Sequence, residues 1–249
     1  MVLMAEKIAV ISDIHGNFWA LQSVLDDLKK RNVDVIFNLG DSLYGPLDPA
    51  KTFELLCKQN MISILGNEDR LILDSVDKAT TNSTLEYVMS KLSNEAFSWL
   101  DSLPPTTLYK DFFLCHGTVN RDDEYCIERV TEKGVKRKEN DELLQDIRGI
   151  EQAVICCGHS HLNSVIQLKS NRYIVNPGSV GLQAYRDSVP FDHVMQTGNP
   201  NASYCIINKD NEWYRFEHVL VSYDWASAAA CAVTNHRKDW ARWLQTGKA

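Results

Sequence analysis

The sequence predicts an α/β fold in which parallel strands come first and antiparallel strands follow. A strand, a helix and a second strand succeed one another within the first 39 residues, which implies parallel pairing through a right-handed crossover. After residue 162 the pattern changes to four β-rich runs separated by turn residues, which is typical of antiparallel pairing. Five of the apolar runs end in residue types that bind metals.

The composition describes an ordinary globular protein with an acidic balance. Of 249 residues, 44% are hydrophobic and 24% are charged, so a sizeable core can form. A formal net charge of −7 argues against broad nucleic-acid binding, including nuclease activity, but allows a small anionic substrate because bound metal ions set the local charge. Because the sequence contains no repeat, low-complexity tract or linker, we expect a single domain over residues 1–249.

Three features predict a cytoplasmic protein without a membrane partner. No apolar run approaches transmembrane length. Residues 1–5 lead straight into a strand, without the basic start and long apolar core of a signal peptide. There are seven cysteines, an odd number, and those in apolar runs are expected to be buried, reduced thiols, namely Cys57, Cys115, Cys156, Cys157 and Cys205.

The first half of the chain predicts alternating strands and helices. Asn17 is a suitable N-cap for a helix that starts at Phe18, and basic residues suit the C-terminus of that helix. A helical segment inserted at 70–103 interrupts the alternation and is closed by two prolines. Strands are expected at 8–11, 33–39, 61–65, 106–109, 112–115 and 153–157, helices at 18–30, 50–58 and 139–148, and a surface excursion at 118–138.

The second half predicts strands at 163–168, 172–175, 202–208 and 213–221. The long connection at 182–201 is more often functional than accidental in a compact domain. Tyr223 to Leu244 is expected to form one closing helix, whose tryptophans pack on a sheet rather than form a binding site.

The first metal-binding pattern is the D-x-H triplet of Asp13 and His15. In an extended segment, residues two apart point the same way, so the carboxylate and the imidazole can reach one point. Such a pair suits a divalent ion that accepts mixed oxygen and nitrogen ligands, such as Mn, Fe, Zn, Ni or Co.

The same arrangement recurs after four further strands. These runs end in G-D, G-N, C-H-G and G-H-S-H, and they add the candidate ligands Asp41, Asn67, His116, His159 and His161. Each could alone be a turn residue or a hydrogen-bonded histidine, but ligand sites gather at the carboxyl ends of strands. Seven ligands are too many for one ion and suit two ions about 4 Å apart that share a carboxylate.

This ordered set of motifs resembles the calcineurin-like metallophosphoesterase superfamily. D-I-H-G-N, the L-Y-G after G-D, and N-P-G-S-V-G at 176–181 resemble its small bacterial phosphodiesterase branch, which is related to diadenosine tetraphosphate hydrolases. The resemblance implies a four-layer αββα fold, in which two mixed β-sheets lie face to face with helices outside.

The resemblance also implies roles for individual residues. One ion would be held by Asp13, His15 and His161, the other by Asn67, His116 and His159, and Asp41 would bridge them. We favour Mn for both ions, and a bridging water would attack phosphorus in line. Asn67 would also bond a phosphate oxygen, and His159 or His116 would stabilise developing negative charge.

Two positions depart from the common family pattern. Tyr44 stands where many members have a second aspartate, and Glu68 stands where many have a histidine that protonates the leaving group. An ionised glutamate cannot donate that proton, and its charge repels a doubly charged monoester more than a diester. We therefore expect a phosphodiesterase or phosphoanhydride hydrolase acting on small, nucleotide-type substrates. The alternatives are a monoesterase, a dinucleoside polyphosphate hydrolase and a catalytically weak interaction scaffold.

Two further residues are candidate substrate contacts. Asn17 lies at a helix N-terminus and would bring backbone N–H donors to a phosphate; plain capping is the alternative. Arg186, the only Arg or Lys of 182–201, would bind a non-bridging phosphate oxygen; a solvated loop arginine is the alternative. The sequence leaves the oligomeric state open.

Overall fold

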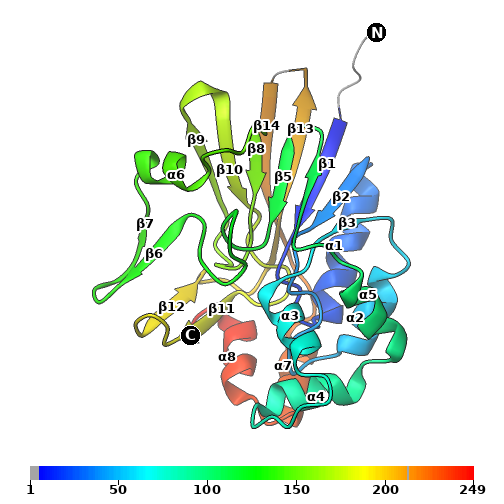
Figure 1. The fold of residues 1–249 in the computed structure, drawn as a ribbon. Coiled ribbons are helices and arrows are strands. Elements are labelled where there is room, and N and C mark those ends of the chain that lie inside the picture. The colour runs from blue at the N-terminus through cyan, green and yellow to red at the C-terminus, as the bar shows by residue number, and fades with distance from the viewer. Residues whose placement is uncertain (1–5, 212) are drawn as a thin grey trace.

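The computed structural model describes residues 6–211 and 213–249, and these form two five-stranded mixed β-sheets (Figure 1). In the first sheet β1 pairs in parallel with β2, and β2 with β3, which confirms the predicted crossover topology. β13 runs antiparallel to β1 and carries β14 on its other side. The strands are β1 (Glu6–Ile11), β2 (Val35–Asn38), β3 (Ile62–Ser63), β13 (Ala202–Asp210) and β14 (Trp213–Val221).

The second sheet has the strand order β4-β5-β8-β10-β9. β5, β8 and β10 pair in parallel, and the edge strands β4 and β9 are antiparallel to their neighbours. The hairpin that the sequence predicts at 106–115 is therefore confirmed. The strands are β4 (Thr106–Tyr109), β5 (Phe112–Cys115), β8 (Val154–Cys156), β9 (Ser164–Leu168) and β10 (Arg172–Asn176), with a short 3-10 turn (Lys169–Asn171) before β10.

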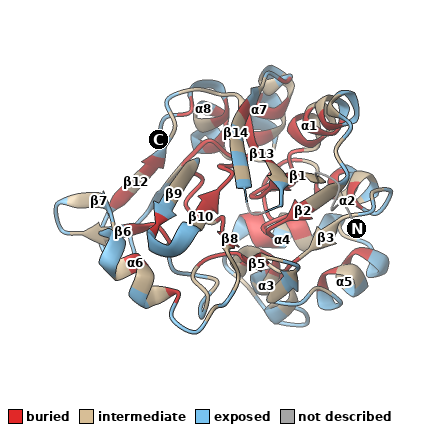
Figure 2. Ribbon diagram, turned by 90° about the horizontal axis from the view of Figure 1, so that it is seen from above, coloured by how far each residue is buried: buried red, intermediate tan, exposed pale blue. Residues whose placement is uncertain are grey.

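The two sheets pack face to face and helices cover their outer faces. The core between the sheets contains Val10 and Phe37 from one sheet and Phe112 and Val154 from the other. α1 (Phe18–Arg31), α2 (Pro49–Leu56) and α7 (Trp225–Thr234) cover the first sheet, and α6 (Asn140–Asp146) covers the second. In Figure 2 these helices are buried on the inside and exposed on the outside. This is the predicted four-layer arrangement.

The remaining helices lie beyond the carboxyl ends of the strands (Figure 1). α3 (Asn67–Asp74), α4 (Ser83–Lys91) and α5 (Asn94–Asp101) follow β3, in the region where the sequence predicts inserted helices. α8 (Lys238–Thr246) packs against α7 and contacts β11 (Ala184–Asp187). These helices and β11 therefore border the end of the sheets where the candidate ligands are expected.

The single helix predicted over 223–244 is wrong, because the chain turns between α7 and α8. The amide of Arg237 bonds the carbonyl of Ala232 at 2.8 Å, and that of His236 bonds Val233 at 3.0 Å. His236 has φ 61°. This is the 6→1 and 5→2 pattern of a helix end, here formed without glycine, so the sequence carries no strong signal for it.

Two segments expected to lack strands each contain a hairpin. β6 (Glu128–Thr131) pairs with β7 (Gly134–Arg137) within the expected surface excursion, and β11 (Ala184–Asp187) pairs with β12 (His193–Gln196) within the long connection. Charged residues occupy both strands of the first hairpin and obscure the alternation of apolar and polar residues. β7 contacts β12, so the two hairpins support one another.

The expectations about membrane spans, cysteines and residues 1–5 have different outcomes. None of the helices in the described part of the chain is long and apolar enough to cross a membrane. All seven cysteines are free thiols, and Cys115, Cys156, Cys157 and Cys205 are buried as expected, but Cys57 is exposed at the end of α2. The interpretation of residues 1–5 lies outside the described residues.

Candidate metal centre

The seven candidate ligands come from loops that meet at the carboxyl ends of the strands and from the start of α3. Six of them follow β1, β2, β5 and β8 directly, and Asn67 is the first residue of α3. Asp13, His15, Asp41, His116 and His161 are all at most 3% exposed. The sheets therefore bring residues up to 148 positions apart in the sequence (13 to 161) into one buried cluster.

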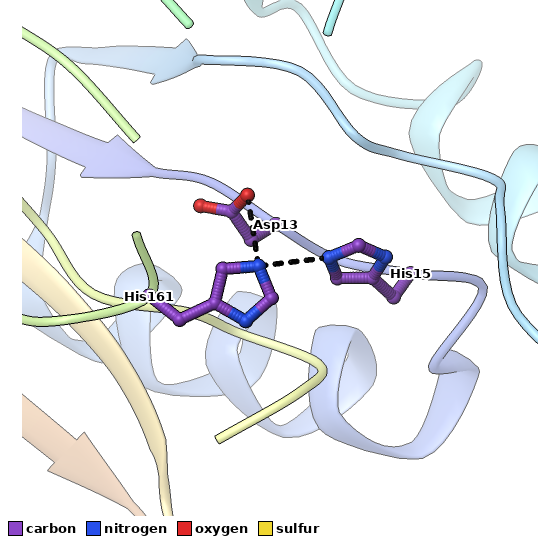
Figure 3. Close-up of side chains that lie close together, drawn as sticks. All are labelled: Asp13, His15 and His161. Atoms are coloured by element: carbon purple, nitrogen blue, oxygen red, sulfur yellow. Dashed lines mark hydrogen bonds and ion pairs between the residues drawn. The ribbon is translucent and has the colours of Figure 1, made fainter. Parts of the chain in front are cut away.

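Asp13, His15 and His161 form the first group (Figure 3). The Nε2 atoms of the two histidines lie 3.1 Å apart, and His161 Nε2 lies 3.3 Å from Asp13 Oδ1. All three ligand atoms fall within 4.8 Å of one another. Two imidazole nitrogens and a carboxylate that face one point are a suitable ligand set for a divalent transition-metal ion.

Asp41, His116 and His159 form the second group, whose ligand atoms also lie within 4.8 Å of one another. His116 Nε2 is 3.2 Å from Asp41 Oδ2 and 3.9 Å from Asp13 Oδ1. The second group therefore adjoins the first, and Asp41 also forms a group with His15.

Three of the histidines are fixed in the same tautomer by backbone carbonyls. The Nδ1–H groups of His15, His116 and His161 donate to Tyr44 O (3.0 Å), Leu39 O (2.8 Å) and Leu182 O (2.6 Å). Because a carbonyl can only accept, each ring keeps a proton on Nδ1, and Nε2 is the nitrogen that is free to bind a metal when the ring is neutral. Metal-binding histidines are held in this way.

Several ligand atoms lack a partner that their burial would demand. Asp13 Oδ1, His116 Nε2 and Asn67 Oδ1 are buried side-chain atoms without a hydrogen bond within the described part of the chain. Leaving a buried polar atom unpaired costs about 1–3 kcal/mol. Asn67 Oδ1 is such an atom, whereas Asp13 Oδ1 and His116 Nε2 have only the ion-pair contacts given above. All three atoms lie in or beside the two ligand groups, so the residues present fit bound cations.

The ligand loops have an unusual backbone. Asp13, His15, Asp41, His159 and His161 all have φ between 51° and 65°. The extended geometry that we expect for Asp13 and His15 is therefore wrong: the two side chains converge because both residues adopt the left-handed conformation. Each such residue costs roughly 1–2 kcal/mol, and clustered strain of this kind is typical of functional sites.

Glycines let the loops approach one another closely. A Cβ atom on Gly66 would collide with the backbone nitrogen and carboxylate of Asp41, and one on Gly158 would collide with Ser12 Oγ and crowd Asp13 Oδ2 at 2.9 Å. The glycines of the G-N and G-H-S-H motifs are therefore required by the packing of the ligand loops.

Asp69, which the sequence analysis missed, ties two of these loops together. Its buried carboxylate accepts the amides of Ser42 at 2.9 Å, Leu43 at 3.1 Å and Gly66 at 3.4 Å. It thus holds the loop of Asp41 against the start of α3, which carries Asn67. A short-range pattern gives no sign of such long-range backbone contacts.

The carboxylates and imidazoles shift one another's protonation. Burial disfavours the charged form of His15 and His116, but nearby carboxylates outweigh it and raise their pKa to about 9 and about 10, respectively. Burial and the neighbouring His116 lower the pKa of His159 to about 4. Against the effect of burial, the histidines lower the pKa of Asp13 and Asp41. A metal ion that binds at His15 and His116 must therefore displace a proton from each ring.

Glu68 lies beside His15 at the edge of the centre. Its Oε2 is 3.1 Å from His15 Nδ1, and its backbone amide donates to Asp41 Oδ1 at 2.8 Å. Burial raises the pKa of the Glu68 carboxyl, while His15 opposes that effect. Glu68 thus contacts the candidate ligands and also lines the cavity described next.

A cavity of about 300 Å³, which we call the α8 cavity, opens over the ligands. Arg186 lines it, with its guanidinium 3.3 Å from Asp192 Oδ2 and 64% of its side chain exposed. Nothing in the sequence pointed to a further wall of this cavity, which α8 and the residue before it provide. That wall consists of Arg237, Trp240 and Trp243.

The tryptophans of this wall have two roles. Trp240 is 4% exposed and belongs to the core, as the sequence predicts, but its ring also meets the edge of His15 at 5.8 Å. Its neighbour Trp243 is only partly buried and lies at the cavity.

Asn17 is fully buried and caps α1. Its Oδ1 accepts the amide of Ala20 at 3.1 Å, and its Nδ2 donates to Gly181 O at 2.9 Å and to Tyr223 Oη at 3.2 Å. These bonds occupy both ends of the side-chain amide, and Asn17 is not among the residues that line the α8 cavity. They favour the capping role over a contact with substrate.

Comparisons with known proteins agree with this geometry. The model of the calcineurin-like phosphoesterase superfamily domain matches residues 7–202. A metallophosphoesterase structure from Sphaerobacter thermophilus is 25% identical and covers 98% of this chain and 100% of its own, with a TM-score of 0.75. An uncharacterized protein of Methanocaldococcus jannaschii is 29% identical over 96% of both chains. A candidate diadenosine tetraphosphatase is similar in fold, with 18% identity, a TM-score of 0.52 and coverage of 88% and 96%.

Proposed function

This chain belongs to the calcineurin-like phosphoesterase superfamily, and on that premise we propose that it hydrolyses small phosphodiesters or phosphoanhydrides with two divalent metal ions. The substrate is a small phosphorylated molecule of nucleotide type, and Mn²⁺ is the favoured ion. The observation that carries the proposal is the shared orientation of His15, His116 and His161, whose Nδ1 atoms all bond backbone carbonyls. Their Nε2 atoms point into the cluster, those of His116 and His161 at 3.2 and 3.3 Å from buried carboxylates and that of His15 at 3.1 Å from His161 Nε2.

The ligand groups divide between two ions. Asp13, His15 and His161 would hold one ion, and Asn67, His116 and His159 would hold the other. Asp41 would bridge them, because it forms groups with residues of both sets. When bound, the two ions would supply an acidified water as nucleophile and would neutralise charge on the phosphate.

The protein's own groups orient the reactants. The carbonyls of Tyr44, Leu39 and Leu182 fix three imidazoles, and Asp69 fixes the loop of Asp41. The arginine Arg186, at the mouth of the α8 cavity, is placed to bond a non-bridging phosphate oxygen.

Glu68 favours diesters over monoesters. It lines the α8 cavity where a substrate phosphate would enter, and it lies next to His15. A monoester carries about two negative charges near neutral pH and a diester carries one, so an ionised Glu68 penalises the monoester more. General acid catalysis contributes about 10²–10⁴-fold, so without a histidine here poor leaving groups are cleaved slowly.

The test compares Glu68→His with the wild-type enzyme on a matched aryl monoester and aryl diester in the presence of Mn²⁺. We expect the variant to raise kcat/KM for the monoester more than for the diester. Glu68→Gln is the control, because it removes the charge without supplying an acid. If the ratio of kcat/KM for the monoester to kcat/KM for the diester is the same in both variants as in the wild-type enzyme, Glu68 does not set the substrate class.

The second candidate function is a non-catalytic interaction scaffold on the same fold, which Glu68 favours because it replaces a catalytic histidine. A panel of mono-, di- and dinucleotide phosphates with Mn²⁺ discriminates the two. Turnover that Asp41→Asn abolishes supports the enzyme, and absence of turnover with every phosphate supports the scaffold.

A further inference from the structure

The candidate metal centre lies where two cavities meet. The first is the α8 cavity. The second, of about 550 Å³, lies between the loop at 121–125 and the β6–β7 and β11–β12 hairpins, and we call it the hairpin cavity. Asn67, His159 and Asp187 line both cavities. Both volumes fall within the range of small-molecule sites, about 300–1,000 Å³.

A third cavity, of about 410 Å³, touches His116 but is not lined by Asn67 or His159. Its lining is formed by the 116–123 loop and residues 105–106, and it has no lining residue in common with the α8 cavity. The α8 cavity and the hairpin cavity are therefore the pair that a molecule bound at Asn67 and His159 can enter together.

The α8 cavity offers cations beside an aromatic ring. Arg186 and Arg237 lie at it together with Trp243, and the guanidinium of Arg237 stacks 5.5 Å from the ring of Trp240. Guanidinium groups bind phosphate oxygens, and an indole stacks on a flat ring. This lining suits an aromatic arm that carries negative charge.

The hairpin cavity has a different lining. Val189 and Pro190, at the turn of the β11–β12 hairpin, form an apolar side, and Val189 is 70% exposed. Arg129 and Lys138 are drawn toward α6, with Arg129 Nη1 3.3 Å from Glu142 and Lys138 Nζ 2.9 Å from Asp146. The carboxyl groups of Asp123, Glu124, Glu128 and Asp187 also line it, so this cavity disfavours an arm that carries negative charge.

We propose that the substrate carries an organic group on each side of the scissile phosphate, one held in the α8 cavity and the other in the hairpin cavity. This inference rests on the proposed function and adds a second binding subsite to it. The two ester oxygens of a diester diverge from phosphorus, so a phosphate at Asn67 and His159 directs one arm toward each cavity. A monoester fills one cavity only.

The test uses three aryl phosphates with the same leaving group and the Mn²⁺-loaded enzyme. They are p-nitrophenyl phosphate, methyl p-nitrophenyl phosphate and bis(p-nitrophenyl) phosphate. The two diesters carry the same charge, so repulsion by Glu68 affects them equally. They differ only in whether the second arm is a methyl or an aryl group.

Each cavity is filled by one exposed substitution. Val189→Trp fills the hairpin cavity, and Arg186→Trp fills the α8 cavity. Arg186→Ala removes the cation without filling the cavity, so its comparison with Arg186→Trp isolates the effect of the added indole. Leu108→Trp is the matched control, because Leu108 is 59% exposed on β4 and lies at neither cavity. Circular dichroism and thermal melting show that each variant is folded.

We expect each filling variant to lower kcat/KM for the bis-aryl diester by about tenfold or more, which corresponds to about 1.4 kcal/mol. Because Arg186→Trp also removes the proposed phosphate contact of Arg186, it is compared with Arg186→Ala, whereas Val189→Trp is compared with the wild-type enzyme. Against these references, kcat/KM for the methyl aryl diester and for the monoester, which have one aryl arm, should be lowered by one filling variant and not by the other. Sensitivity of the bis-aryl diester to one variant alone, or to neither, overturns the two-armed subsite.

Failure of this inference is distinct from failure of the proposed function. If the wild-type enzyme hydrolyses none of the three esters, the phosphoesterase proposal falls. If it hydrolyses them but the filling variants affect all three alike, the function stands and the second subsite falls.

Discussion

Removal of the Asp69 carboxylate tests how the ligand loops are held. This side chain is fully buried, and it accepts the backbone amides of Ser42 and Leu43 at 2.9 and 3.1 Å and that of Gly66 at 3.4 Å. In Asp69→Ala these amides lose that acceptor at a place that water does not reach. Asp69→Asn keeps one oxygen for the amides of Ser42 and Leu43.

The expected magnitude follows from the two short bonds. An unsatisfied buried donor costs about 1–3 kcal/mol, so Asp69→Ala should lower the free energy of unfolding by about 2–6 kcal/mol. Total stability is about 5–15 kcal/mol for a protein domain, so Asp69→Ala removes a large fraction of it, and Asp69→Asn, which keeps one acceptor, is the milder variant. Asp41 precedes Ser42, and a displacement of about 1 Å at a reacting centre costs about 10²-fold in rate. We therefore expect kcat/KM to fall by about that factor.

The pH dependence provides a second readout. Burial, and then the charge of Asp41, raise the pKa of Asp69 from 3.8 to about 7. The folded state thus favours the protonated acid, and the contribution of Asp69 to stability falls as pH rises from 3.8 through about 7. The destabilisation caused by Asp69→Asn should accordingly be smaller at pH 8 than at pH 5.

Urea denaturation of the metal-free wild-type and variant proteins at these two pH values measures both effects. The reasoning is refuted if Asp69→Ala lowers the free energy of unfolding by less than about 1 kcal/mol, because a buried amide without a partner costs at least that much. If Asp69→Asn lowers the free energy of unfolding by the same amount at pH 5 and at pH 8, the pKa of Asp69 is not raised in the folded protein.

Three further predictions concern single groups. Arg186→Ala should raise KM several-fold without loss of stability, because its ion pair with Asp192 is exposed; unchanged KM and kcat for every accepted substrate would remove Arg186 from the site. Gly158→Ala should weaken metal binding, measured by titration calorimetry, because the added Cβ displaces Asp13; unchanged affinity would contradict the packing described here. In the metal-free protein, the protonated forms of His15 and His116 stabilise the fold, and this contribution is fully present below pH 6.5. It is lost as pH rises through the pKa values of about 9 and about 10, so the free energy of unfolding should fall over that interval. A free energy of unfolding that does not fall there contradicts the raised pKa values.

Strand ends were the part of the site that the sequence could predict. Asp41 follows a strand of the first sheet and His116 a strand of the second, and the carboxyl ends of parallel strands meet at one edge of each sheet, so the edge on which each ligand lies was predictable. Their convergence further requires the face-to-face packing of the two sheets. The conformation of the loops was not predictable in this way. Asp13 and His15 adopt positive φ, which local sequence preference disfavours and which the surrounding packing imposes.

One local feature escaped prediction because its usual signal is missing: the turn at His236 lacks the glycine that marks a helix end, yet it places Arg237 at the cavity. Two other features escaped prediction because they depend on distant contacts. The β6–β7 hairpin contains many charged residues and is supported by β12. Asp69 bonds amides 27 and 26 positions earlier in the chain. Each of these depends on the assembled fold rather than on neighbouring residues.

Metal content after reconstitution with Mn²⁺ tests the dinuclear centre most directly. The ligand set predicts close to two equivalents per chain in the wild-type protein. Asp41→Asn should reduce occupancy of both ions, whereas Asp13→Asn should weaken mainly one. A reproducible single equivalent, unchanged when Asn67 or His116 is replaced by alanine, would contradict a centre that binds two ions.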